Sequence, residues 1–147
     1  MEPESLPPDF KDFFRFLNAE KVEYLLVGGW AVGVYGASRY TQDIDVWVAI
    51  NEENARRVVR ALRSFGFTQG EADESLVLNP GNIIRMGFPP LRIEIINRID
   101  GVEFQDCASR RELVTISGIE IPVISLEDLL INKRASGRPK DLIDLII

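Results

Sequence analysis

A short stretch near the end of the first third of the chain alternates between acidic and strongly apolar side chains, and this limits the folds that the chain can adopt. Ile44, Val46 and Val48 fall on one face of a strand. Asp43 and Asp45 fall on the opposite face, about 7 Å apart along the strand. The flanking apolar residues indicate a half-buried strand, where two neighbouring anions repel each other unless a cation lies beside them.

A divalent metal ion is one cation that suits this acidic face. Mg²⁺ is commonly bound by one or two carboxylates together with the phosphates of a substrate. The alternatives are an exposed strand face with solvated aspartates, or aspartates paired with Arg39. The sequence Asp43-Ile44-Asp45 alone does not separate these interpretations.

Periodic patterns elsewhere predict helices mixed with strands, and therefore an α+β or α/β domain with a mixed β-sheet flanked by helices. We expect one domain over residues 1–147, with residues 1–8 as a flexible tail. The predicted helices cover the region around residues 10–17, then residues 31–35, 52–65, 125–137 and 139–147. The predicted strands cover residues 24–27, 43–48, 76–78, 82–86, 91–96, 113–116 and 119–121.

Composition removes several classes of chemistry. The 147 residues include no histidine, so a histidine base, a serine–histidine pair and a histidine metal site are excluded. Cys107 is the only cysteine, so no intrachain disulfide forms, and we expect it to be a small half-buried apolar residue. The net charge of −6 does not favour long-range attraction to a polyanion. No apolar run reaches the roughly 20 residues of a membrane span, so we expect a cytoplasmic protein.

Gly28 and Gly29 follow the apolar run of residues 24–27 and precede a predicted helix. Glycines at such a turn let backbone N–H groups approach a phosphate closely. The alternative is an ordinary tight turn between a strand and a helix. The spacing fits neither a P-loop nor a G-x-G-x-x-G motif.

Two further charged residues lie where apolar residues are expected. Glu94 stands within an apolar strand, where it is either paired with Arg92 on the same face or acts as a metal ligand or general base. Lys133 falls on the apolar stripe of the predicted helix 125–137. It either extends along the edge of the core toward water or reaches into a cleft and holds a phosphate.

Taken in order, these motifs resemble the nucleotidyltransferase (DNA polymerase β-like) superfamily. The matching segments are residues 27–32, with the glycine pair, and residues 39–48, with the two aspartates. The resemblance is closest to compact bacterial AbiEii-like nucleotidyltransferases related to toxin–antitoxin systems, and residues 124–130 and 133–141 share it. It covers the chain from about residue 22 to the end.

The resemblance implies a role for each matching residue. Asp43, Asp45 and Glu94 would be the catalytic carboxylates and would bind Mg²⁺ or Mn²⁺. The implied nucleotide-binding residues are Gly28, Gly29, Arg39, Thr41, Lys133 and Asp141. The implied substrate is a nucleoside triphosphate, from which a nucleoside monophosphate passes to a hydroxyl of an acceptor such as tRNA, a protein or a small molecule.

The chain departs from the superfamily pattern at two positions. Glu94 stands where aspartate is usual, and Trp30 follows the second glycine in place of a hydroxyl residue. These departures keep a second hypothesis open, in which the chain is a catalytically inactive antitoxin or interaction module with a toxin–antitoxin partner protein. A nucleotide-binding sensor without turnover is a third hypothesis.

Overall fold

The computed structural model describes residues 6–36, 43–66, 73–88 and 91–137. Helices and strands alternate along much of this part of the chain. The helices are α1 (Pro8–Ala19), α2 (Gly28–Val34), α3 (Glu52–Phe65), α4 (Glu74–Leu78), α5 (Phe104–Ser109) and α6 (Leu126–Ser136). The strands are β1 (Tyr24–Val27), β2 (Asp43–Val48), β3 (Ile83–Phe88), β4 (Leu91–Ile96), β5 (Glu112–Ile116) and β6 (Ile119–Val123).

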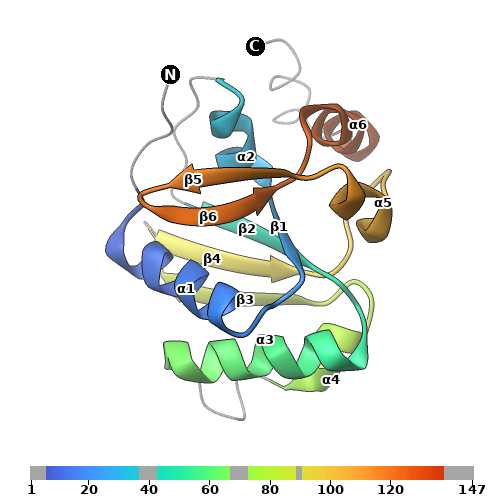
Figure 1. Cartoon of the computed structure of the whole chain (residues 1–147). Helices are drawn as coiled ribbons and strands as arrows, with labels where there is room; N and C mark the ends of the chain where they lie inside the picture. The colour runs from blue at the N-terminus through green and yellow to red at the C-terminus, as the bar shows by residue number, and fades with distance from the viewer. Residues whose placement is uncertain (1–5, 37–42, 67–72, 89–90, 138–147) are drawn as a thin grey trace.

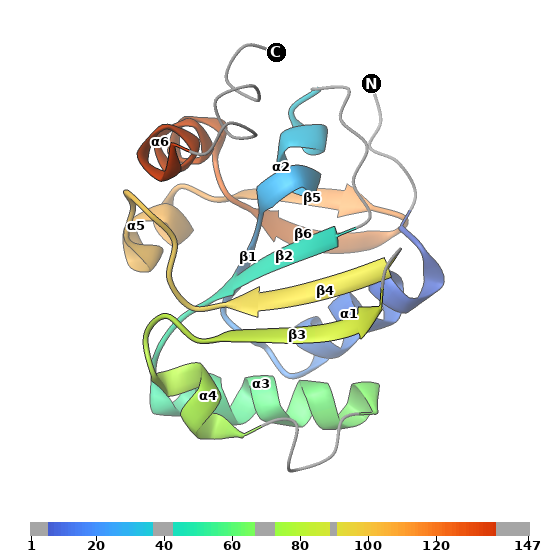
Figure 2. The same cartoon turned by 180° about the vertical axis from the view of Figure 1, so that it is seen from behind.

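The strands form one six-stranded mixed sheet, in the order β3-β4-β2-β1-β6-β5 (Figure 1). β2 lies between β1, with which it is antiparallel, and β4, with which it is parallel. Figure 2 shows β2, β4 and β3 side by side from the other side of the molecule. The expected mixed α+β fold is thus confirmed.

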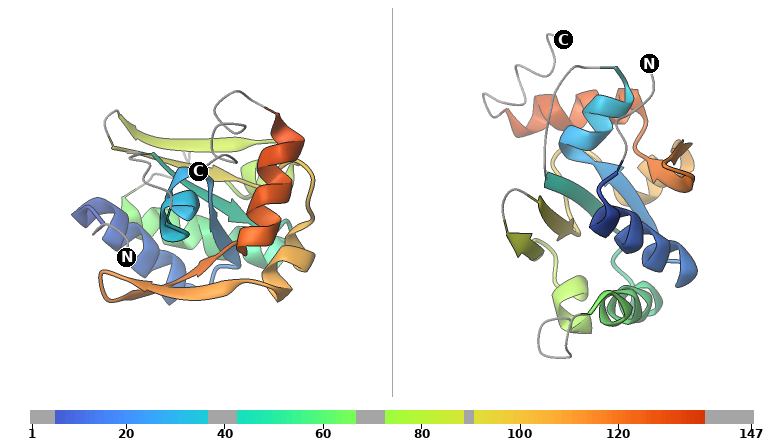
Figure 3. Two further views of the ribbon diagram at one scale, coloured as in Figure 1. Left: turned by 90° about the horizontal axis from the view of Figure 1, so that it is seen from above. Right: turned by 90° about the vertical axis from the view of Figure 1, so that its left-hand side faces the viewer.

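The alternation of β2 places its apolar side chains in the core. Ile44, Val46 and Val48 are buried, whereas Asp43 and Asp45 on the opposite face are half-buried. Helices α3 and α4 lie on the other side of the sheet from α2 and α6 (Figure 3). The acidic face of β2 therefore lies on the side of the sheet that α2 and α6 cover.

A buried asparagine fixes α3 against the sheet. The side chain of Asn54 accepts a hydrogen bond from the backbone N–H of Glu23 at 2.7 Å. It donates to the carbonyls of Glu23 and Ala49 at 3.1 and 2.9 Å. All of its hydrogen-bonding groups are thus occupied, as a buried amide requires. These bonds join α3 to the start of β1 and the end of β2.

The structure corrects three expectations about local structure. Residues 76–78 are part of helix α4 and not a strand, because Asp73 caps the preceding turn through the N–H of Ser75. Residues 6–8 were expected to belong to a flexible tail but are part of the fold, since Leu6 is buried, its N–H donates to the Ser117 hydroxyl, and α1 begins at Pro8. Helix α2 begins at Gly28, three residues before the expected start.

The remaining elements follow the expected pattern, with a few exceptions. Helices α1 and α3 lie where their apolar stripes indicated, and Ser125 caps α6 as expected by accepting from the N–H of Asp128. Helix α5 was not expected from the sequence. The helix expected over residues 139–147 lies outside the described residues. None of the described helices combines the length and apolar character that crossing a bilayer requires.

Helix α1 is part of the core. Phe14 is fully buried, and its ring centroid lies 5.9 Å from that of Tyr24 on β1. We predict that Phe14→Ala lowers the free energy of unfolding by about 3–5 kcal/mol, because it leaves a cavity as well as removing apolar burial. Urea denaturation measures this change. Arg15→Ala, on the exposed face of the same helix, is the control, and an equal loss in both variants would contradict the assignment of α1 to the core.

Candidate functional site

A cavity of about 530 Å³ lies over the acidic face of β2. Its lining comes from the turn between β1 and α2, from strands β2, β3 and β4, from the segment after β4, and from α6. Six residues singled out from the sequence contribute to this lining: Gly28, Gly29, Asp43, Asp45, Glu94 and Lys133. The fold therefore brings together residues that are more than 100 positions apart in the chain.

The pairing of β2 with β4 explains why the carboxylates share one wall of the cavity. Asp45 is the register partner of Glu94, and Asp43 is the register partner of Arg92. Register partners on adjacent strands point to the same face, with the strands about 4.8 Å apart. The face thus carries three carboxylates and one guanidinium in two adjacent rows.

Two arginines pair with this set of carboxylates. Arg92 donates a hydrogen bond to Asp43 over 3.1 Å and lies 3.6 Å from Glu94. Arg85 on β3 pairs with Glu94 from the other side at 3.4 Å. The bond and charge of Asp43 raise the pKa of Arg92 above its usual range, so Arg92 stays charged. The ion pair between Arg92 and Glu94, which the sequence offered as an alternative, is present.

Gly28 lies against one of the carboxylates. Its φ is +70°, a left-handed conformation that side chains other than glycine rarely adopt. A Cβ at this position would lie 2.2 Å from Oδ2 of Asp45. The backbone of the turn can therefore approach Asp45 only because residue 28 is glycine.

Lys133 reaches the same cavity from α6. It is 4% exposed, and it lines the cavity together with the carboxylates of β2 and β4. The neighbouring residue Asn132 donates a hydrogen bond to the carbonyl of Asp100 at 2.9 Å. This bond ties α6 to the segment that follows β4, which fixes the position of the lysine relative to Glu94.

Trp30 does not take part in the cavity. It is buried beneath α1, where its ring lies edge-on to Phe10 with centroids 6.4 Å apart. Trp30, which stands where a hydroxyl residue usually follows the glycine pair, is therefore a core residue.

Three residues assigned to the nucleotide by resemblance, Arg39, Thr41 and Asp141, lie outside the described residues. Arg85, on the other hand, was not predicted as a site residue from the sequence. Its signal is the alternation of Ile84 and Met86 on the buried face of β3 with an arginine between them. Such a charge on a strand adjacent to an acidic face is a pairing candidate.

The oxygen donors fit a magnesium ion bound by two carboxylates. In the described part of the chain, no three acidic, histidine or cysteine side chains are arranged to hold a metal ion together. Mg²⁺, however, needs only one or two protein carboxylates when substrate phosphates supply other ligands. Asp43 and Asp45 meet this requirement, and the backbone of Gly28 lies so close to Asp45 that no side chain fits between them.

Comparison with solved structures shows the same fold in three other proteins. A Thermotoga maritima protein assigned to the nucleotidyltransferases matches with a TM-score of 0.60 and 21% identity, over 93% of this chain and 88% of its own. The lincosamide antibiotic adenylyltransferase LnuA, in its lincomycin-bound form, matches with a TM-score of 0.60 and 16% identity, over 97% and 95%. An antigenic nucleotidyltransferase-like protein from Paracoccidioides brasiliensis matches with a TM-score of 0.55 and 17% identity, over 94% and 72%.

Sequence comparison identifies a family as well. No curated protein matches the chain. Residues 11–147, which include all the strands and the whole lining of the cavity, match a family described as "Nucleotidyltransferase of unknown function". The chain therefore belongs to this family of nucleotidyltransferases, DUF6036.

Proposed function

We propose that the chain is a Mg²⁺-dependent enzyme that transfers a nucleoside monophosphate from a nucleoside triphosphate to a hydroxyl group of an acceptor. The observation that supports this most strongly is the convergence of Gly28, Asp43, Asp45, Glu94 and Lys133 on one cavity. These residues lie on four separate elements, so their convergence is a property of the fold.

The acidic residues of β2 supply the metal ligands in this proposal. Mg²⁺ held by Asp43 and Asp45 would neutralise charge on the phosphates. Lys133 holds the triphosphate from α6, where its buried position limits the screening of its charge by water. The backbone N–H groups of Gly28 and Gly29 donate to phosphate oxygens at the turn.

The transfer itself is a displacement at phosphorus. The acceptor oxygen attacks the α-phosphorus and forms a new oxygen–phosphorus bond. The bond from the α-phosphorus to the oxygen that bridges to the β-phosphorus breaks, and pyrophosphate leaves with its electron pair. We assign the proton of the acceptor hydroxyl to the carboxylate of Glu94, which lies opposite Asp45 on the next strand.

The similarity to an adenylyltransferase makes ATP the first nucleotide to test, followed by the other three NTPs. Acceptors fall into the classes tRNA, protein and small molecule. The alternative is a catalytically inactive module that keeps the fold and binds a toxin–antitoxin partner. The pairing of Arg92 with Asp43 and Glu94 favours this alternative, because it gives both carboxylates a cationic partner without a metal ion.

We predict that Asp45→Asn lowers the affinity for Mg·ATP at least tenfold, because the amide is a weaker metal ligand and carries no charge. Isothermal titration calorimetry with and without EDTA measures the magnesium-dependent part of the binding. Asp12→Asn, on the exposed face of α1, is the matched control and should bind as the unchanged protein does.

A transfer assay with α-labelled NTPs and each acceptor class then separates the enzyme from the inactive module. Label transfer that disappears in Asp45→Asn supports the enzyme. If the unchanged protein does not bind any Mg·NTP, or if Asp45→Asn binds it equally well, the proposed function is wrong.

We predict that Gly28→Ala also weakens Mg·ATP binding at least tenfold, because the added methyl group displaces the carboxylate of Asp45. The positive φ should in addition lower the free energy of unfolding by about 1–2 kcal/mol. Calorimetry and urea denaturation measure the two effects separately.

Gly33→Ala is the control for this substitution, since Gly33 lies in α2 and a Cβ there meets nothing within 4 Å. It should keep full affinity and raise stability by about 0.5–1 kcal/mol, as alanine does inside a helix. Nucleotide binding that survives Gly28→Ala unchanged would remove the turn from the proposed site.

A further inference from the structure

A second and larger cavity, of about 860 Å³, adjoins the first. The two share the segment from Arg98 to Asp100, which follows β4. They also share the same face of β2, because Trp47 lines the second cavity two residues after Asp45 lines the first. Two residues of a strand span about 7 Å, so a molecule in the second cavity lies next to the carboxylates of the first.

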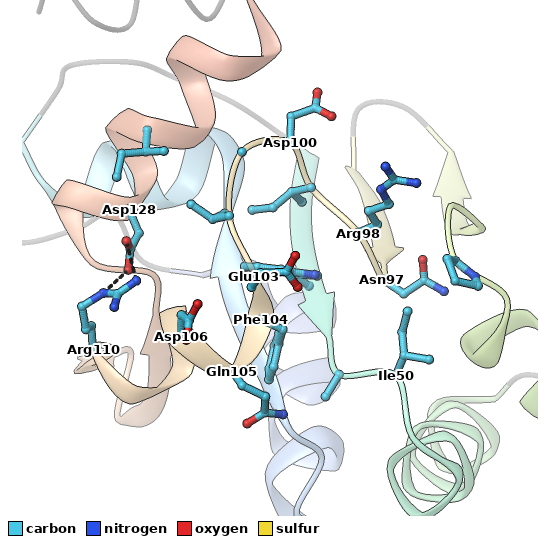
Figure 4. A pocket seen from close by; sticks show the side chains of 17 residues that line it. Ile50, Asn97, Arg98, Asp100, Glu103, Phe104, Gln105, Asp106, Arg110 and Asp128 are labelled. Carbon is cyan, nitrogen blue, oxygen red and sulfur yellow. Dashed lines mark hydrogen bonds and ion pairs between the residues drawn. The ribbon is translucent and has the colours of Figure 1, made fainter.

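The charged residues of the second cavity are mostly acidic (Figure 4). Arg110 and Asp128 neutralise each other through two hydrogen bonds of 3.0 Å each. The remaining lining carries the carboxylates of Asp100, Glu103 and Asp106 against the single guanidinium of Arg98. The excess negative charge favours a cation and disfavours a polyanion such as RNA.

Apolar and aromatic surface lies among these carboxylates. Phe104 is half-buried, and its ring meets Trp47 edge-on, with centroids 5.1 Å apart. Figure 4 shows Glu103 and Phe104 close together on the same segment. An aromatic ring next to a carboxylate suits an organic cation, which gains from both the ring face and the charge.

One buried donor among the residues that line this cavity has no hydrogen-bond partner in the described part of the chain. Trp47 is 2% exposed, and its indole N–H makes no hydrogen bond within the described part of the chain. A buried donor without an acceptor is unfavourable, so an oxygen or nitrogen of a bound molecule would stabilise it. The unpaired indole N–H is independent of the acidic charge of the lining, and it also indicates a polar ligand.

We propose that the second cavity binds the acceptor, and that the acceptor is a small organic molecule with amino groups that are protonated at neutral pH and with a free hydroxyl. A volume of this order suits a small molecule, not a folded macromolecule. The assignment rests on the proposed function, since the first cavity must supply the nucleotide whose α-phosphorus the hydroxyl attacks.

The test uses a charged probe and its neutral counterpart. The trisaccharide of glucosamine carries three amino groups and several hydroxyls, and its fully N-acetylated form has the same skeleton without the positive charge. Isothermal titration calorimetry of the full chain, without nucleotide or Mg²⁺, should show the charged sugar binding at least tenfold more tightly. The difference should shrink in 0.5 M salt, because salt screens exposed charges.

The double variant Glu103→Gln/Asp106→Asn should lower the affinity for the glucosamine trisaccharide at least tenfold. Both side chains are exposed and Glu103 makes no capping hydrogen bond, so the fold does not depend on them. Glu120→Gln, an exposed carboxylate on β6 away from both cavities, is the matched control and should leave the affinity unchanged.

The inference is overturned if both sugars bind equally, if neither binds, or if a ten-nucleotide RNA binds in place of the sugar and loses affinity in the double variant. Binding of Mg·ATP is measured separately in the same variants. If the unchanged protein binds Mg·ATP but not the glucosamine trisaccharide, the acceptor assignment alone is overturned. Sugar binding in a protein that does not bind any Mg·NTP overturns the assignment of this cavity to an acceptor as well as the proposed function.

Discussion

The contact between the Gly28 backbone and the Asp45 carboxylate determines how the rest of the cavity can be used. β1 pairs with β2 so that Val27 lies opposite Asp45, and the chain turns into α2 at the next residue. Without a side chain at residue 28, the backbone of the turn and the carboxylate lie side by side. A phosphate bound at the turn would therefore lie next to the acidic face of β2, which is the arrangement that a metal ion between phosphate and carboxylate needs.

Arginines balance the acidic face in the structure, and this bears on how a metal ion would bind. Arg92 pairs with Asp43 and Glu94, and Arg85 pairs with Glu94 as well. A metal ion that binds Asp43 therefore competes with Arg92 for that carboxylate. In the proposed site, a metal ion bound to Asp43 would displace the guanidinium of Arg92 from that carboxylate.

Much of this fold could be predicted from the sequence, because periodicity and capping are local. Helix α3 has an apolar stripe and an asparagine cap, and its bounds were predicted. Helix α4 was wrongly predicted as a strand because a short apolar run has no period of its own, and only its Asp73 cap distinguishes it. The candidate site was harder to predict, since Asp45 and Glu94 become neighbours only because β2 and β4 are adjacent in the sheet. The ion pair of Arg85 with Glu94 likewise forms only because β3 is the other neighbour of β4 in the sheet.

The most direct test of the central claim is a crystal structure of the protein with Mn²⁺ and α,β-methylene-ATP, which cannot be cleaved between its α- and β-phosphorus atoms. Anomalous scattering locates the manganese ion. We expect it within about 2.0–2.6 Å of carboxylate oxygens of Asp43 and Asp45 and of a phosphate oxygen, with the triphosphate between Gly28 and Lys133. A nucleotide bound elsewhere, or an ion that leaves Asp43 bonded to Arg92 and does not contact Asp45, would contradict the account.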